Sequence, residues 1–193
     1  MWRKRRRPAE ENERIITGRE RARERTMNRA VKLLAAKPRS VGELRERLLE
    51  KNWTDPAIVD AVIEKLSDYK YLDDEQYAAD LAVSKLRQQP QGPRRLKQAL
   101  SQKKLDKEIV DQALSTAFEK IPEAELIDQA IEKRIRLKGR PETRDDTKKF
   151  YDHLLRRGFS YDLVAARLRD IAKFDPAEAA DGPNDFSPID IPD

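Results

Sequence analysis

Few side chains in this chain are of types that carry out chemistry, and they are scattered. Asp73 and Asp74 are adjacent carboxylates, a pair that acid and base catalysis or a divalent cation would use. They also stand where a helix is expected to begin, and a carboxylate there accepts hydrogen bonds from unpaired backbone amides. We therefore interpret Asp73 and Asp74 as helix caps, without a metal.

His153 is the one histidine of the chain, and cysteine is absent. Without a second histidine or a thiolate, no residues are present to form an ordinary zinc site, a thiol nucleophile or a disulfide. The sequence also has no glycine-rich phosphate loop and no nucleophile with a base nearby. We predict that the protein is not an enzyme, that it binds no cofactor or metal, and that His153 is a plain surface or interface residue.

Basic side chains are more informative, because they are unevenly placed in a chain of net charge +5. Residues 1–25 carry ten Lys or Arg against five Glu, whereas residues 175–193 carry six acids and no base. A basic body with an acidic tail is typical of a protein that meets polyanions, although it also fits a charged, soluble surface with two disordered ends. The residues that we expect to contact a partner or DNA are Arg87, Arg94, Arg95, Lys97, Lys103, Lys104, Arg134, Arg136, Lys138, Arg140, Lys148, Lys149, Arg156 and Arg157.

Helical periodicity must position these residues. Asp73 and Gln76 have the spacing of a capping box, and the helix that they start must stop before Pro90. Gly92 then turns the chain, and Pro93 suits the first position of the next helix. The apolar stripe of that helix consists of Leu96, Ala99 and Leu100. The basic residues of the helix are therefore expected to point away from the core.

Similar signals predict the remaining helices. Capping pairs predict helix starts at two further places, Ser40 with Glu43 and Thr143 with Asp146. A first helix is expected from Arg19, with Ala30, Val31, Leu33 and Leu34 on its apolar face, and another from Pro122 to Gly139. We interpret Trp53 as a core anchor, because Thr54 directly behind it is expected to cap a helix.

An internal repeat organises these helices. Five apolar positions recur at a constant offset in three copies: Leu44, Leu48, Trp53, Ile58 and Val62; Leu96, Leu100, Leu105, Val110 and Leu114; Phe150, Leu154, Phe159, Val164 and Leu168. Three residues of strong capping type, Thr54, Asp106 and Ser160, keep the same register. Each copy is too small to bury its apolar face alone, so neighbouring copies must stack.

The fold class predicted is therefore all-α, with three tandem three-helix repeats stacked into an elongated, curved helical solenoid. We expect a disordered basic arm over residues 1–18, repeats over residues 19–71, 72–120 and 121–174, and a disordered acidic tail over residues 175–193.

The middle copy also carries a resemblance to a known family. Tyr71-Leu72-Asp73-Asp74 followed by Tyr77-Ala78, then Gly92-Pro93-x-Arg95-Leu96, and the basic pair Lys103-Lys104 resemble the motif of the RecX family, bacterial regulators of the RecA recombinase. The resemblance extends over about residues 27–174. One departure is Lys104, where the family commonly has a glycine that ends the helix.

The resemblance implies a modulator that binds the RecA filament on single-stranded DNA and inhibits its recombinase or ATPase activity, with a role in DNA repair, homologous recombination and the SOS response. An alternative from a different class is a free-standing helical-repeat protein that binds DNA or RNA through helix-turn-helix-like pairs. The expected partners are the RecA filament and single-stranded DNA, with double-stranded DNA as a further candidate. We expect a cytoplasmic monomer without a membrane contact, given the lack of cysteine and of a long apolar run.

Overall fold

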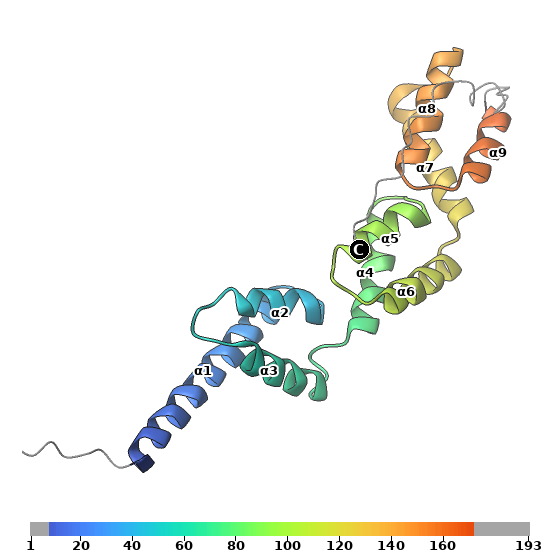
Figure 1. Ribbon diagram of the computed structural model, residues 1–193. Helices are drawn as coiled ribbons and strands as arrows, with labels where there is room; N and C mark the ends of the chain where they lie inside the picture. The colour runs from blue at the N-terminus through green and yellow to red at the C-terminus, as the bar shows by residue number, and fades with distance from the viewer. Residues whose placement is uncertain (1–7, 172–193) are drawn as a thin grey trace, which may run out of the picture. The chain divides into compact units, whose positions relative to one another are not determined.

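The computed structural model describes the backbone of residues 8–171 and the side chains from residue 18 onward. Over this range the chain is helical and contains no strand (Figure 1), so the all-α prediction is confirmed. The helices are α1 (Pro8–Ala36), α2 (Val41–Leu49), α3 (Pro56–Asp68), α4 (Asp74–Gln88), α5 (Pro93–Ser101), α6 (Lys107–Lys120), α7 (Glu123–Lys138), α8 (Arg144–Arg156) and α9 (Tyr161–Ile171).

The start of α1 differs from the expectation. The helix begins at Pro8, whereas we expected a disordered arm up to residue 18 and a helix from Arg19. Proline suits a first helical turn, and the residues after it, rich in Glu, Ala and Arg, are good helix formers. The expected disorder of residues 1–7 and 175–193, and the end of the third repeat at residues 172–174, lie outside the described residues.

Helices α1, α2 and α3 pack around one apolar cluster. Its buried members are Ala30, Leu44, Leu48, Val59, Val62, Ile63, Leu66 and Leu72, with Met27, Leu33, Leu34 and Val41 packed against them. Val31, expected on the apolar face of α1, is instead 50% exposed. At 3.6 residues per turn, the rotation that directs Ala30 and Leu34 inward directs Val31 away from the core.

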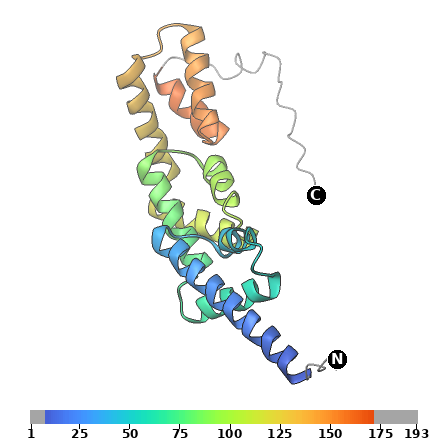
Figure 2. The ribbon, with the colours of Figure 1, turned by 90° about the vertical axis from the view of Figure 1, so that its left-hand side faces the viewer.

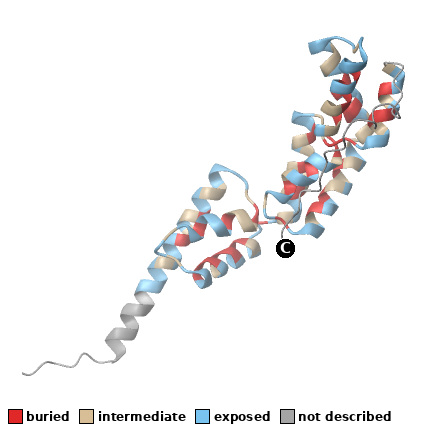
Figure 3. Ribbon diagram, turned by 45° about the horizontal axis from the view of Figure 1, so that its top comes forward, coloured by how far each residue is buried: buried red, intermediate tan, exposed pale blue. Residues whose placement is uncertain are grey.

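Figure 3 shows the buried residues along each ribbon, and on the other helices most of them are apolar. Helix α4 buries Ala78, Ala82 and Leu86, and α5 buries Leu96 and Leu100. Helices α7, α8 and α9 lie side by side in Figure 1 and Figure 2. They enclose a core that includes Leu126, Ile127, Phe150, Leu154, Phe159, Val164 and Leu168.

The chain divides into two compact units. One unit runs up to Val83 and takes in Lys97–Ala117, and the other combines Ser84–Leu96 with the chain from Phe118 onward. The boundary passes through α4, α5 and α6 rather than between repeats.

The apolar register is confirmed with one exception, at the turn between α2 and α3. Asp55, rather than Thr54, is the N-cap of α3 and accepts a hydrogen bond from the Ile58 amide at 2.9 Å. Asp106 and Ser160, by contrast, directly precede α6 and α9 as expected. The first repeat thus has one additional residue in this turn, and the prediction that Trp53 is a core anchor is wrong.

Candidate nucleic-acid and partner interface

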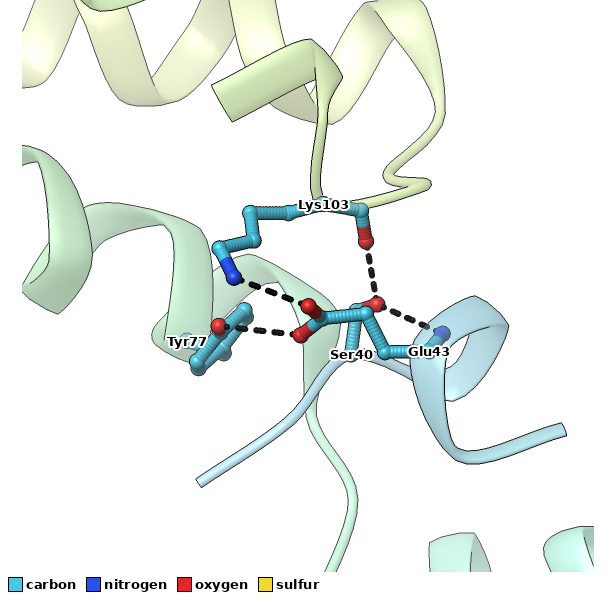
Figure 4. Close-up of polar contacts among 4 residues, drawn as sticks. All are labelled: Ser40, Glu43, Tyr77 and Lys103. Carbon is cyan, nitrogen blue, oxygen red and sulfur yellow. Dashed lines mark hydrogen bonds and ion pairs between the residues drawn. The ribbon is translucent and has the colours of Figure 1, made fainter. Parts of the chain in front are cut away.

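Two junctions between successive repeats are built in the same way, one in each compact unit. In the first, the start of α2 meets the turn that follows α5 (Figure 4). Ser40 caps α2 by accepting a hydrogen bond from the Glu43 amide at 3.0 Å, and its hydroxyl donates to the carbonyl of Lys103. Asp74 adds a bond from α4, because its carboxylate accepts from the Val41 amide at 2.9 Å. Asp73 caps its own helix as predicted, accepting from the Gln76 amide at 2.9 Å.

A partly buried ion pair completes the first junction. The Lys103 ammonium lies 2.8 Å from the Glu43 carboxylate, and the two side chains are only 23% and 19% exposed. The Tyr77 hydroxyl donates to the same carboxylate at 3.3 Å. Burial opposes ionisation of Glu43, but Lys103 and the hydrogen bonds outweigh it and lower the pKa of this carboxyl. The charges of Glu43 and Lys103 therefore compensate each other.

Close backbone approach explains the small residues at these junctions. A Cβ on Gly42 would lie 2.6 Å from the carbonyl oxygen of Lys104. Lys104 itself has a φ of +55°, the left-handed conformation for which the family commonly uses glycine. The turn geometry that the RecX resemblance implies is therefore present, with a lysine in place of the glycine.

In the second junction, the start of α5 meets the turn that follows α8. The Gly92 amide donates to the carbonyl of Arg157 at 2.9 Å, and the Arg94 amide to that of Gly158 at 3.3 Å. A Cβ on Gly92 would overlap the Gly158 carbonyl, and a Cβ on Gly158, whose φ is +83°, would overlap the Arg95 amide. The Gly92-Pro93 motif thus marks the contact between two repeats.

The second junction differs from the first in charge. Arg95 occupies the position that Glu43 has in the first junction, and Arg157 occupies the position of Lys103. An ion pair is replaced by two like charges. Each guanidinium donates to a backbone carbonyl, Arg95 to that of Arg156 at 3.2 Å and Arg157 to that of Pro90 at 2.8 Å. Within the described residues, neither forms an ion pair.

His153 lies among these arginines. The Arg157 Nε atom donates to its Nε2 at 3.2 Å. Burial and the charges of Arg134, Arg157 and Arg156 lower the pKa of His153 to about 4, and burial with Arg95 and Arg134 lowers the pKa of Arg157. We define these five residues, Arg95, Arg134, Arg156, Arg157 and His153, as the second-junction cluster.

Arg134 joins the cluster from α7. Its guanidinium lies over the Phe150 ring, 5.1 Å from the centroid, and its Nε atom is buried without a hydrogen-bond partner in the structure. The sequence did not indicate that Arg95 and Arg134 would both lie near Arg157, because these residues lie far apart along the chain.

The other predicted contact residues fall into two groups. Lys97, Lys103 and Lys104 have acidic partners within the protein, since Lys97 pairs with Asp111 at 2.7 Å and Lys104 with Glu46 at 2.6 Å. The rest are exposed, at the end of α4, at the start of α5, at the end of α7 and along α8 and the turn before it. They are Arg87, Arg94, Arg136, Lys138, Arg140, Lys148 and Lys149.

The described residues contain neither a group of metal ligands nor a membrane-spanning helix. Among residues 18–171, no three His, Cys, Asp or Glu side chains are grouped so that they would hold a metal ion. None of the helices in the described part of the chain is both long and apolar enough to cross a membrane.

The fold and junctions define a class of all-helical proteins built from three tandem three-helix repeats. Models of the first, second and third three-helix domains of RecX match residues 27–66, 73–114 and 122–166. The chain belongs to the RecX family.

Curated relatives with the name Regulatory protein RecX agree with this assignment. That of Prosthecochloris aestuarii is 31% identical over 145 residues, which cover 75% of this chain and 92% of the relative. That of Bacillus subtilis is 30% identical over 144 residues, 75% of this chain and 54% of the relative. The chain thus spans about half the length of the Bacillus relatives that it matches.

Solved structures show the same fold. The crystal structure of RecX from Lactobacillus salivarius superposes with a TM-score of 0.69 at 24% identity, covering 79% of this chain and 97% of that one. A second crystal structure, of a regulatory protein RecX, gives a TM-score of 0.70 at 24% identity, over 83% of this chain and 77% of the other.

Proposed function

We propose that this protein regulates a RecA recombinase by binding the recombinase filament on single-stranded DNA and inhibiting its strand-exchange and ATPase activity. Membership of a family whose curated relatives are named regulatory proteins supports a regulatory role. The observation that carries the proposal of an anionic contact is the second-junction cluster. There the acid that balances the first junction is replaced by Arg95, and the cations have no ion-pair partner among the described residues.

Like charges that are brought together raise the free energy of the folded protein, and an anion placed among them lowers it. Arginine suits this role because its planar donors bind a phosphate or a carboxylate through two hydrogen bonds at once. Both groups occur on a filament of protein and DNA. The cluster therefore fits a phosphate of the DNA or an acidic side chain of the recombinase.

Ion pairs within the protein reduce the number of predicted contact residues that are available to a partner. Lys97, Lys103 and Lys104 would have to leave Asp111, Glu43 and Glu46 in order to bind a partner. Arg94 and Arg95 are exposed and have no such commitment. We propose that these two arginines, with Arg134 and Arg156, make the main contact.

The test measures DNA-dependent ATPase activity and strand exchange by the cognate recombinase while this protein is titrated in. The wild type should inhibit both, and the double variant Arg94→Glu with Arg95→Glu should inhibit much less. The matched control is Lys133→Glu with Arg169→Glu, which makes the same charge change at two exposed positions of the same compact unit. Equal loss in both variants would contradict a specific contact.

A second comparison separates a filament modulator from a free-standing DNA or RNA binder. Affinity for naked single-stranded DNA and for recombinase-coated DNA is measured in one buffer. Binding to naked DNA should weaken with salt by a slope of about 0.7 per phosphate contact, whereas affinity for the filament should keep a salt-resistant part. Equal affinity for both, with an equal salt dependence, would favour the free-standing binder.

A further inference from the structure

Trp53 is exposed in the turn between α2 and α3, because the additional residue of this turn leaves Thr54, and not Trp53, directly before the cap, where Leu105 and Phe159 stand in the other repeats. Its exposed fraction is 39%, against 9% for Leu105 and 0% for Phe159. Tryptophan is a large apolar residue, and exposing part of it to water is unfavourable. A ligand that covers the exposed face would remove this cost.

The cause is the additional residue in this turn. Asp55 caps α3, and the hydroxyl of Thr54 is hydrogen-bonded at 3.0 Å to that of Thr26, which is 1% exposed on α1. Thr54 is thus attached to α1, and Asp55 to the first turn of α3. Trp53 precedes these two residues and lies beside α1 with its ring partly exposed.

Trp53 lines a pocket of about 470 Å³ together with α1. The other lining residues are Arg25, Asn28, Arg29, Lys32 and Leu33. Their spacing of three or four residues places them along one face of the helix. Three of them are cations, and none of the described residues that line the pocket is acidic.

Two details indicate that the pocket is suited to a ligand with a flat face and negative charge. The Nε atom of Arg29 is buried and has no hydrogen-bond partner in the structure. The Lys51 ammonium lies 5.8 Å from the centroid of the Trp53 ring and adds a fourth cation beside the pocket. An aromatic face beside cations is the combination with which proteins hold single-stranded nucleic acid.

We propose that this pocket binds one nucleotide of single-stranded DNA, with its base stacked on Trp53 and the flanking phosphates held by Arg25, Arg29 and Lys32. Asn28 offers an amide that donates to and accepts from a base edge. A duplex does not fit this arrangement, because its bases are already stacked on one another. The site lies in the first repeat and shares no residue with the second-junction cluster.

The site needs no recombinase, so it goes beyond the proposed function. Only the choice of DNA over RNA rests on that function. The test therefore uses the full chain and oligonucleotides alone, and its result is independent of whether the protein inhibits a recombinase.

The readout is the fluorescence of Trp53 in a Trp2→Phe background, where Trp53 is the one tryptophan left. Single-stranded oligothymidylate should quench this emission, and a duplex should do so much less. Trp53→Ala, measured with a labelled oligonucleotide, should weaken binding by about tenfold, the effect of losing one stacked base. Trp53→Phe, which keeps a smaller ring, should fall between the wild type and Trp53→Ala.

The matched control is Tyr69→Ala. Tyr69 is a 61% exposed aromatic residue of the same compact unit with the Lys65 ammonium 5.8 Å from its ring centroid, and it does not line the pocket. This variant should bind oligothymidylate as the wild type does. Equal weakening by Tyr69→Ala and Trp53→Ala would overturn the proposal.

Two further ligands test the chemistry of the site. An abasic oligonucleotide offers the phosphates without the bases, and polyglutamate offers the charge of an acidic protein segment. Both should leave the emission of Trp53 nearly unchanged. Quenching by either ligand as strong as that by oligothymidylate would show an anion site or a protein-docking site, and would overturn base stacking.

Discussion

At the residue scale, the pKa of His153 depends on the charges of the arginines around it. Burial and three arginines lower its pKa to about 4, and an anion bound among those arginines would reverse their effect. We predict that a short single-stranded oligonucleotide raises the pKa of His153 towards its ordinary value. The chain has one histidine, so its imidazole proton signals can be followed by NMR without an assignment problem.

The control for this titration is Arg134→Gln, which removes one of the charges that lower the pKa of His153 and should raise this pKa even without a ligand. If the pKa of His153 stays near 4, its value without a ligand, while the oligonucleotide is bound, there is no anion in the second-junction cluster.

The same shift affects stability. The pKa of His153 is lower in the folded protein than in the unfolded chain, so the unfolded chain binds a proton first as pH falls. We predict that stability is lost between about pH 6.5, the ordinary histidine value, and pH 4. The variant His153→Gln should lose less stability over this pH interval, as measured by urea denaturation. Identical pH dependence of the two proteins would show that His153 titrates alike in both states.

Gly158 of the second junction and Gly139 at the end of α7 provide another prediction. Gly158 has a φ of +83° and no room for a Cβ, whereas Gly139 has a φ of +80° and open space around it. Gly139→Ala should cost about 1 to 3 kcal/mol of backbone strain, because its φ of 80° and ψ of 174° lie in a region essentially confined to glycine. Gly158→Ala should cost more, because overlap with the Arg95 amide is added to the strain. Urea denaturation measures both. Equal costs would show that the junction yields to accommodate a methyl group.

At the scale of the helices, the predicted caps show what the sequence determined. Ser40, Asp73 and Thr143 cap the helices for which they were predicted, because a short acceptor side chain before an apolar stripe has few other uses. Gly92 was expected as a turn residue. Its contact with Gly158 depends on how two repeats stack, which local sequence does not determine.

The register of α3 is where the prediction failed, and the reason is physical. Ile58, Val59, Val62 and Ile63 are all buried, so two registers one residue apart both place apolar residues inward. A constant offset between repeats therefore concealed the additional residue at Trp53. The exchange of Glu43 for Arg95 was visible in the sequence, but only a comparison of charged positions between repeats would have found it.

The corrected cap leads to a prediction for α3. Asp55→Ala should destabilise the protein by about 1 kcal/mol, because the Ile58 amide loses its acceptor. Asp55→Asn should recover most of this loss, since asparagine is an equally good cap. Thermal unfolding followed by circular dichroism measures both variants. An unchanged midpoint for Asp55→Ala would restore Thr54 as the cap.

At the scale of the whole molecule, one repeat has been used three times and its surfaces have diverged. The first junction is neutralised by Glu43 and Lys103, and the second carries uncompensated cations. The pocket at Trp53 occurs in the first repeat, where the turn has its additional residue. The repeats thus differ in charge and in one turn, while the apolar positions that hold each unit together are kept.

The distribution of charge along the whole chain supports a last prediction. Residues 175–193 carry six acids and no base, and we expect them to compete with DNA phosphates for the basic side chains of the body. Exchanging these acids for Asn and Gln should therefore strengthen binding to single-stranded DNA at low salt. The gain should shrink as salt is added, because salt screens the competing charges. Fluorescence anisotropy with a labelled oligonucleotide over a salt series measures this. Truncation after Phe174 is the companion variant: if truncation strengthens binding but neutralisation does not, the tail acts through its bulk and the electrostatic explanation is wrong.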